Sequence, residues 1–104
     1  SVYGATKAAV AQLAKTHAVE WAKYNVQVNC LAPGFIETPL TSKSLWGDER
    51  KRRWLLDRIP ARRAGAPDDL SATLLLLASP QATYLTGQTI AVDGGVLAGG
   101  SWED

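Results

Sequence analysis

The sequence predicts an α/β fold in which two parallel strands are joined by a helical crossover. Three observations support this prediction: a long alanine-rich helical stretch, two short apolar runs that each lead into a glycine turn, and a helical segment between the two runs. Strand, helix and strand in this order give a parallel pair with a right-handed connection. Because parallel strands are normally buried inside a larger sheet, two of them do not make a complete sheet.

The first predicted element is a helix from Tyr3 to Tyr24, which is rich in strong helix formers. Tyr3 and Lys7 stand four residues apart and therefore share one helix face. A positive charge near a phenol favours the phenolate form, so this pair indicates general acid/base chemistry. His17 lies about four turns further along, and we interpret it as part of a packing surface.

A buried strand is predicted for residues 26–31, and it ends at a turn that contains Pro33 and Gly34. Thr38 precedes a proline and can cap a following helix. Ligands gather at the carboxyl ends of strands in open α/β sheets, although a plain turn and helix cap is the alternative. Cys30 is interpreted as packing, since one cysteine makes neither a disulfide framework nor a zinc site, and we predict no metal.

Residues 40–59 are predicted to form a mobile helical flap. The flap contains Trp46, Trp54 and the basic run 50–53. Acidic residues beside this run and a net charge of only +1 favour a solvated helix face over nucleic-acid binding. Tryptophans on a flap can close over a small ligand, and simple packing is the alternative for each of them.

A second helix is predicted for residues 70–78, with Pro67 and two aspartates at its start, where carboxylates favour the helix dipole. Its leucine run, residues 74–77, is apolar nearly all round and predicts burial on more than one side. Residues 88–92 then form the second predicted strand, which is closed by Asp93 and two glycines.

The length and composition predict one small soluble domain. The 104 residues contain no sustained apolar run, so we predict no membrane partner and a cytoplasmic location. The absence of methionine and the position of Tyr3 near the start lead us to expect that the chain is part of a longer protein.

Several short motifs follow one another in a characteristic order. Tyr3 to Lys7 has the pattern Tyr-x-x-x-Lys, and residues 28–39 give a strand followed by a Pro-Gly turn. Residues 65–70 have the pattern Gly-x-Pro-x-Asp-Leu, and residues 84–95 close the series. Together they resemble the C-terminal part of the classical short-chain dehydrogenase/reductase family. Residues 59–97 most resemble members that act on gluconate or deoxygluconate.

This resemblance implies a Rossmann-type doubly wound parallel sheet and NAD(P)-dependent interconversion of an alcohol and a ketone. Tyr3 would exchange the proton at the substrate oxygen, while Lys7 would bind the nicotinamide ribose and keep the pKa of the tyrosine low. Residues 40–59 would form the substrate lid. Four further residues would contact the cofactor: Pro33, Gly34, Ile36 and Thr38.

Other elements of the family pattern have no match in the sequence. These are the Gly-rich phosphate loop, the residue that selects NAD or NADP, the catalytic serine and a supporting asparagine. We therefore assign residues 1–104 to the C-terminal part of a single domain that lacks the N-terminal βαβ units. This chain alone is predicted to bind no cofactor.

Two interpretations stay open. The chain is either part of an oxidoreductase for a small alcohol or ketone, or a catalytically silent remnant that associates with itself. In both cases we predict a homo-oligomer, a dimer or a tetramer, because the alanine-rich helix and the leucine run carry more buried-type surface than two strands can cover.

Overall fold

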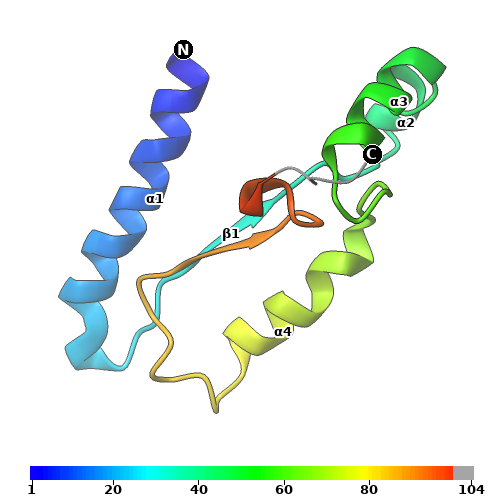
Figure 1. Ribbon diagram of the computed structural model, residues 1–104. Helices are drawn as coiled ribbons and strands as arrows, with labels where there is room; N and C mark the ends of the chain where they lie inside the picture. The colour runs from blue at the N-terminus through cyan, green and yellow to red at the C-terminus, as the bar shows by residue number, and fades with distance from the viewer. Residues whose placement is uncertain (100–104) are drawn as a thin grey trace. The chain divides into compact units, whose positions relative to one another are not determined.

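The computed structural model describes residues 1–99, and its elements follow the predicted order (Figure 1). The elements are α1 (Val2–Trp21), β1 (Cys30–Pro33), α2 (Thr41–Ser44), α3 (Glu49–Arg58), α4 (Ser71–Ala78) and β2 (Thr89–Val92), with 3-10 turns at Ala22–Tyr24, Pro67–Leu70 and Val96–Ala98. The chain divides into two compact units. The first contains residues 1–31 and 73–90, and the second contains residues 32–72 together with those from 91 onward.

Helix α1 confirms the predicted first helix. It begins directly after Ser1, whose side-chain oxygen accepts a hydrogen bond from the amide of Gly4 at 3.4 Å. Its regular part ends at Trp21 and continues as a 3-10 turn to Tyr24. Asn25 then adopts a left-handed conformation with φ 58°, which stops the helix, because Asn tolerates this conformation better than most residues.

The first strand is shorter than predicted. It begins at Cys30 instead of residue 26, and it includes Pro33, which we had assigned to the turn. The reason is that the preceding backbone is bonded to a side chain. The amide of Val28 donates to the hydroxyl oxygen of Thr86 at 3.0 Å instead of to a neighbouring strand. The residues before Cys30 therefore form no regular ladder.

The Asn29 side chain also links this segment to the loop before β2. Its Nδ2 donates to the carbonyl of Leu85 at 3.0 Å, and its Oδ1 accepts from the amide of Gln88 at 3.0 Å. A side-chain amide offers the same donor and acceptor as a peptide group. Asn29 thus takes the place of a backbone pairing at the start of the sheet.

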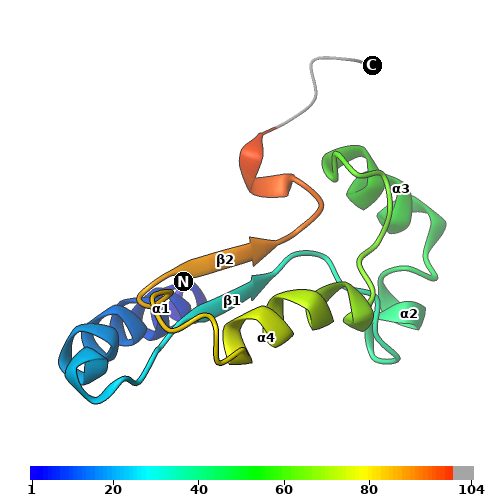
Figure 2. The same cartoon turned by 90° about the horizontal axis from the view of Figure 1, so that it is seen from below.

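The two strands pair in parallel, as predicted. The amide of Cys30 donates to the carbonyl of Gln88 at 2.8 Å, and the amide of Gly34 donates to that of Val92 at 2.9 Å. Residue numbers rise in both strands from the first bond to the second, which is the pattern of parallel strands. The two strand arrows also point the same way in Figure 2.

The leucine run of α4 differs from its prediction. We expected burial on more than one side, but Leu74, Leu75 and Leu76 are all exposed, with Leu75 71% accessible. The apolar composition of the run would favour burial. Within the described chain, no element covers that surface.

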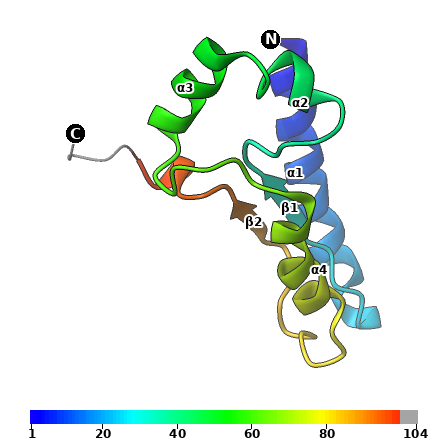
Figure 3. The same ribbon diagram turned by 90° about the vertical axis from the view of Figure 1, so that its right-hand side faces the viewer.

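The second unit has a small apolar core between its two helices. Trp46, Leu55 and Ile59 are buried, and Leu45, Leu56, Ala64 and Val96 pack against them. Figure 3 shows α2 and α3 as two short helices joined by the turn that carries Trp46. Trp46 thus has the packing role that we left open for it, whereas Trp54 is 53% accessible.

Candidate active site

Tyr3 and Lys7 lie near the start of α1, in the first unit. The Lys7 ammonium nitrogen is 5.5 Å from the centroid of the Tyr3 ring, so the two side chains meet on one face of the helix as predicted. Tyr3 is 73% accessible. A phenol that can donate or accept a proton therefore lies at the surface beside a cation, and the cation is attracted to the face of the ring.

Pro33 and Gly34 lie at the carboxyl end of β1, in the second unit. Gly34 approaches β2 so closely that an added Cβ would lie 2.6 Å from the Cα of Asp93. Pro33 and Gly34 line a hollow of about 260 Å³ together with Val96 and Leu97. The absence of a side chain at Gly34 is what lets the two strand ends meet.

Ile36 forms an isolated parallel bridge with Gly65. The bridge uses the carbonyl of Phe35, which accepts from Gly65 at 2.9 Å, and the amide of Glu37, which donates to Gly65 at 2.8 Å. This pattern turns the amide and carbonyl of Ile36 itself toward the opposite edge. There the carbonyl accepts a hydrogen bond from the Thr41 hydroxyl at 3.3 Å.

Thr38 exchanges hydrogen bonds with the start of α2. Its amide donates to the hydroxyl oxygen of Thr41 at 2.9 Å, and its own hydroxyl oxygen accepts from the Thr41 amide at 3.3 Å. The predicted role of Thr38 as the helix cap is not found, because α2 begins at Thr41 and its N-cap position is Leu40, which makes no side-chain cap bond. The backbone of Thr38 also accepts from Ser42 at 2.8 Å, so the whole turn is held by short-range bonds.

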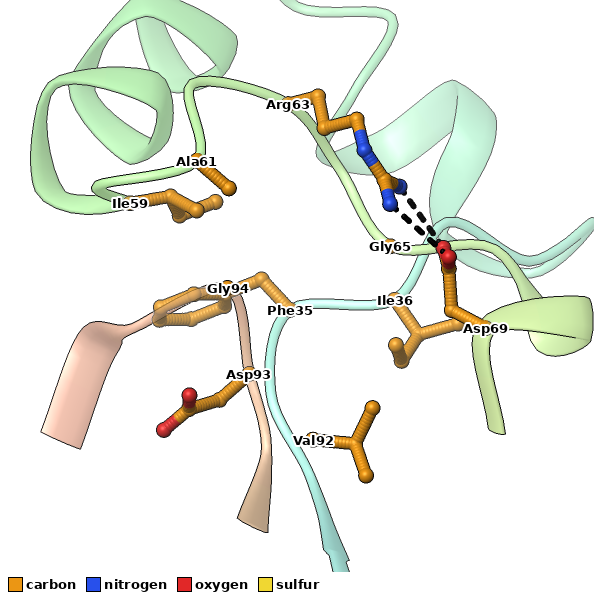
Figure 4. Close-up of a pocket in the computed structure, with 10 residues that line it drawn as sticks. All are labelled: Phe35, Ile36, Ile59, Ala61, Arg63, Gly65, Asp69, Val92, Asp93 and Gly94. Carbon is orange, nitrogen blue, oxygen red and sulfur yellow. Dashed lines mark hydrogen bonds and ion pairs between the residues drawn. The ribbon is translucent and has the colours of Figure 1, made fainter. Parts of the chain in front are cut away.

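The structure also contains a polar pair that sequence reasoning missed. A cavity of about 110 Å³ in the second unit is bordered by Arg63 and Asp69, and its other walls are mostly apolar residues such as Phe35 and Ile36, with Asp93 among them (Figure 4). The Arg63 guanidinium donates to both oxygens of the Asp69 carboxylate, at 2.8 and 2.9 Å. One signal for this pair was available in the sequence, because Arg63 and Asp69 lie on either side of the predicted turn at Gly65.

Asp69 has a third partner, the amide of Ala66 at 2.7 Å. The hydrogen bonds from Arg63 and from this amide hold the pKa of the Asp69 carboxyl well below its usual range. The same pairing raises the pKa of Arg63. Asp69 therefore fixes the turn at residues 63–66 from its place as the third residue of the 3-10 helix Pro67–Leu70, a role beyond the predicted interaction with the helix dipole.

Residues 1–99 contain neither a cluster of metal ligands nor a membrane-spanning helix. No three His, Cys, Asp or Glu side chains of this range lie close enough together to hold a metal ion. None of the helices described there combines the length and the apolar character needed to cross a membrane.

Comparison with known sequences gives consistent matches over most of the chain. Residues 1–97 match a sequence family described as enoyl-(acyl carrier protein) reductase. The chain is 47% identical over 96 residues to the 2-dehydro-3-deoxy-D-gluconate 5-dehydrogenase of Escherichia coli K12, which covers 92% of this chain and 38% of that protein. It is 46% identical over 100 residues to a tropinone reductase homolog of Arabidopsis thaliana, which covers 96% of this chain and 32% of that protein.

Solved structures give the same result. A putative 2-deoxy-D-gluconate 3-dehydrogenase of Agrobacterium tumefaciens with bound NADP has a TM-score of 0.87 and 42% identity, over 93% of this chain and 39% of that one. A gluconate 5-dehydrogenase of Burkholderia cenocepacia in complex with NADP and tartrate has a TM-score of 0.86 and 42% identity, over 93% and 38%. The chain thus spans less than two fifths of the length of each of these relatives.

Proposed function

Because the chain belongs to the short-chain dehydrogenase/reductase family, we propose that the protein carrying it interconverts an alcohol and a ketone with NAD or NADP. Its helices and strands form part of a Rossmann-type fold, in agreement with the predicted fold class. The proposed substrate is a sugar acid or a similar small polar molecule. The support for this choice is the identity with the deoxygluconate dehydrogenase of E. coli and with the gluconate 5-dehydrogenase of B. cenocepacia.

One observation carries the proposed chemistry, namely the meeting of Tyr3 and Lys7 on one face of α1. Tyr3 would give a proton to the ketone oxygen during reduction and take it back during oxidation. Lys7 would favour the phenolate that oxidation requires, because a nearby positive charge stabilises it. The same ammonium would donate hydrogen bonds to the ribose of the cofactor.

Four further cofactor contacts are proposed for residues that belong to the second unit. Ile36 suits a carboxamide, because its backbone donor and acceptor are turned away from the Gly65 bridge. Pro33 and Gly34 would lie against the nicotinamide, and the Thr38 hydroxyl would reach its carboxamide or a phosphate. When bound, the cofactor supplies or receives the hydride.

Substitution of the pair tests this proposal in the full-length protein that carries the sequence. Tyr3→Phe removes the exchangeable proton and is expected to lower kcat by about 100-fold or more. Lys7→Met should lower kcat and also raise the KM for the cofactor. Lys15→Met, on the same helix, is the matched control. NADPH oxidation with a keto sugar acid is followed by absorbance, and full activity of Tyr3→Phe would contradict the proposal.

The isolated 104-residue chain is proposed to be inactive, because its sequence contains no Gly-rich phosphate loop. Titration with NADH and NADPH, followed by nicotinamide fluorescence, should show no saturable binding. A micromolar dissociation constant would overturn this part of the proposal while leaving the role of Tyr3 intact.

The alternative is a self-associating module without catalysis. It is favoured by the exposed leucines of α4, above all Leu75, because a large apolar surface is usually covered by a partner. We propose a homo-oligomer under either alternative. Sedimentation should find particles larger than one 11.1 kDa chain, whereas a compact monomer would contradict the association. We also propose a cytoplasmic location. The single cysteine supports it, because disulfide-rich sequences are typical of oxidising compartments and one cysteine forms no internal disulfide.

A further inference from the structure

The turn between α2 and α3 carries a hollow within residues 40–59, the predicted substrate lid, and none of its lining residues has a named role in the proposed reaction. This hollow, named here the α3 pocket, has a volume of about 510 Å³ and is lined by Leu45, Asp48, Arg50, Lys51, Trp54 and Leu55. Small-molecule sites commonly measure about 300–1,000 Å³, so the α3 pocket is large enough for a ligand. None of the six residues is among those assigned above to the acid/base pair or the cofactor.

The charged walls of the α3 pocket carry excess positive charge. Among the described residues, neither Arg50 nor Lys51 forms an ion pair with a carboxylate, and the Lys51 ammonium reaches only the carbonyl of Ser44, at 3.4 Å. Asp48 is the acidic wall residue. One of its oxygens already accepts the amides of Arg50 and Lys51, at 3.0 and 3.2 Å, as the cap of α3. Two cationic side chains are therefore available to an anion.

The remaining walls are apolar. Leu55 is part of the buried core, whereas Trp54 is 53% accessible, which is unusual for so large an apolar side chain. The Arg58 guanidinium lies 3.6 Å from the centroid of a Trp54 ring, and it also donates to the Trp54 carbonyl at 3.1 Å. These contacts restrain the indole before any ligand arrives, which lowers the entropy cost of binding.

We propose that the α3 pocket binds a small organic carboxylate with an apolar or aromatic body. The carboxylate would pair with Arg50 and Lys51, and the apolar body would lie against Trp54, Leu45 and Leu55. A polyhydroxylated acid suits the pocket less well, because an apolar wall leaves its hydroxyl groups without partners. An extended polyanion is disfavoured by the carboxylates of Glu49 and Asp57, which lie on the same helix.

Three probes of matched design test this inference on the 104-residue chain by isothermal titration calorimetry. The ligand 4-phenylbutyrate has both features, 4-phenylbutylamine has the same body with the opposite charge, and gluconate has a carboxylate without an apolar body. We expect 4-phenylbutyrate to bind with a dissociation constant of about 1 mM or lower. The other two should bind at least about tenfold more weakly. Amide chemical shift changes should centre on residues 45–55.

Variants separate this site from general electrostatic attraction. The double substitution Arg50→Met and Lys51→Met should weaken 4-phenylbutyrate binding by about tenfold or more. Arg53→Met removes one charge from the same basic run but lies outside the pocket lining, so it should change the affinity by less than about twofold. Circular dichroism checks that each variant keeps its helices. The proposal is overturned if 4-phenylbutyrate shows no saturable binding or if the amine binds with equal affinity. It is also overturned if Arg53→Met weakens binding as much as the double variant does.

Discussion

The contact between Gly34 and Asp93 predicts a large cost for adding a single methyl group. In Gly34→Ala the new Cβ would lie 2.6 Å from the Cα and 2.7 Å from the Cβ of Asp93, well inside van der Waals contact. Asp93 directly follows β2, and its Cα and Cβ cannot rotate away, so the strand ends must separate. Overpacking of this kind costs about 1–3 kcal/mol. The hydrogen bond from Gly34 to Val92, now 2.9 Å, would lengthen and cost about 1 kcal/mol more.

Urea unfolding followed by far-ultraviolet circular dichroism measures this effect. A loss of about 2–4 kcal/mol in the free energy of unfolding corresponds to a midpoint lowered by about 1–3 M for a small protein. Gly4→Ala is the matched control, and it should raise the free energy of unfolding instead of lowering it. A Cβ there meets nothing nearer than the Ser1 hydroxyl oxygen at 3.8 Å, and alanine in a helix is favoured over glycine by about 0.5–1 kcal/mol. An unchanged midpoint for Gly34→Ala would refute the close approach of the strand ends.

Three further predictions concern other parts of the chain. Arg62 has a left-handed φ of 58°, so Arg62→Gly should be more stable than Arg62→Ala by about 1 kcal/mol in urea unfolding. Because Arg63 lowers the folded-state pKa of Asp69, the stability that this carboxylate contributes is present above its unfolded pKa of about 3.9 and is lost as the pH falls further. Asp69→Asn should therefore flatten the fall in melting temperature below about pH 4. Asn29→Ala removes both side-chain bonds to loop 85–88 and should cost about 1–3 kcal/mol, with hydrogen exchange accelerated first in that loop.

The order and type of the elements could be predicted because periodicity is a local property. Helix α1 and strand β2 lie close to their predicted bounds, since alanine-rich sequence and a short β-branched run are direct signals. The start of β1 could not be predicted, because it depends on the bonds of Val28 to Thr86 and of Asn29 to Leu85, which are far apart in the sequence. The leucines of α4 indicate a surface that favours burial, but composition does not identify what covers it.

In the candidate site too, the features set by local sequence could be predicted and those set by the folded turn could not. The meeting of Tyr3 and Lys7 follows from helical spacing alone, and the structure bears it out. The pairing of Arg63 with Asp69 depends on a turn in which Arg62 adopts a conformation that non-glycine residues rarely take, so sequence gives little indication of it. The functional roles of Tyr3 and Lys7 stay predictions until the substitutions are made.

The side-chain amide of Asn29 has a consequence for strand alignment. Each strand has only four residues, so a shift of two positions would keep the same side chains on each face and still leave two residues of each strand paired. Such a shift would leave the Leu85 carbonyl and the Gln88 amide without their partner, at a cost of about 1–3 kcal/mol for the part-buried carbonyl and less for the exposed amide, which water can reach. A single side chain outside the strands thereby favours the observed alignment over the one that is shifted by two residues.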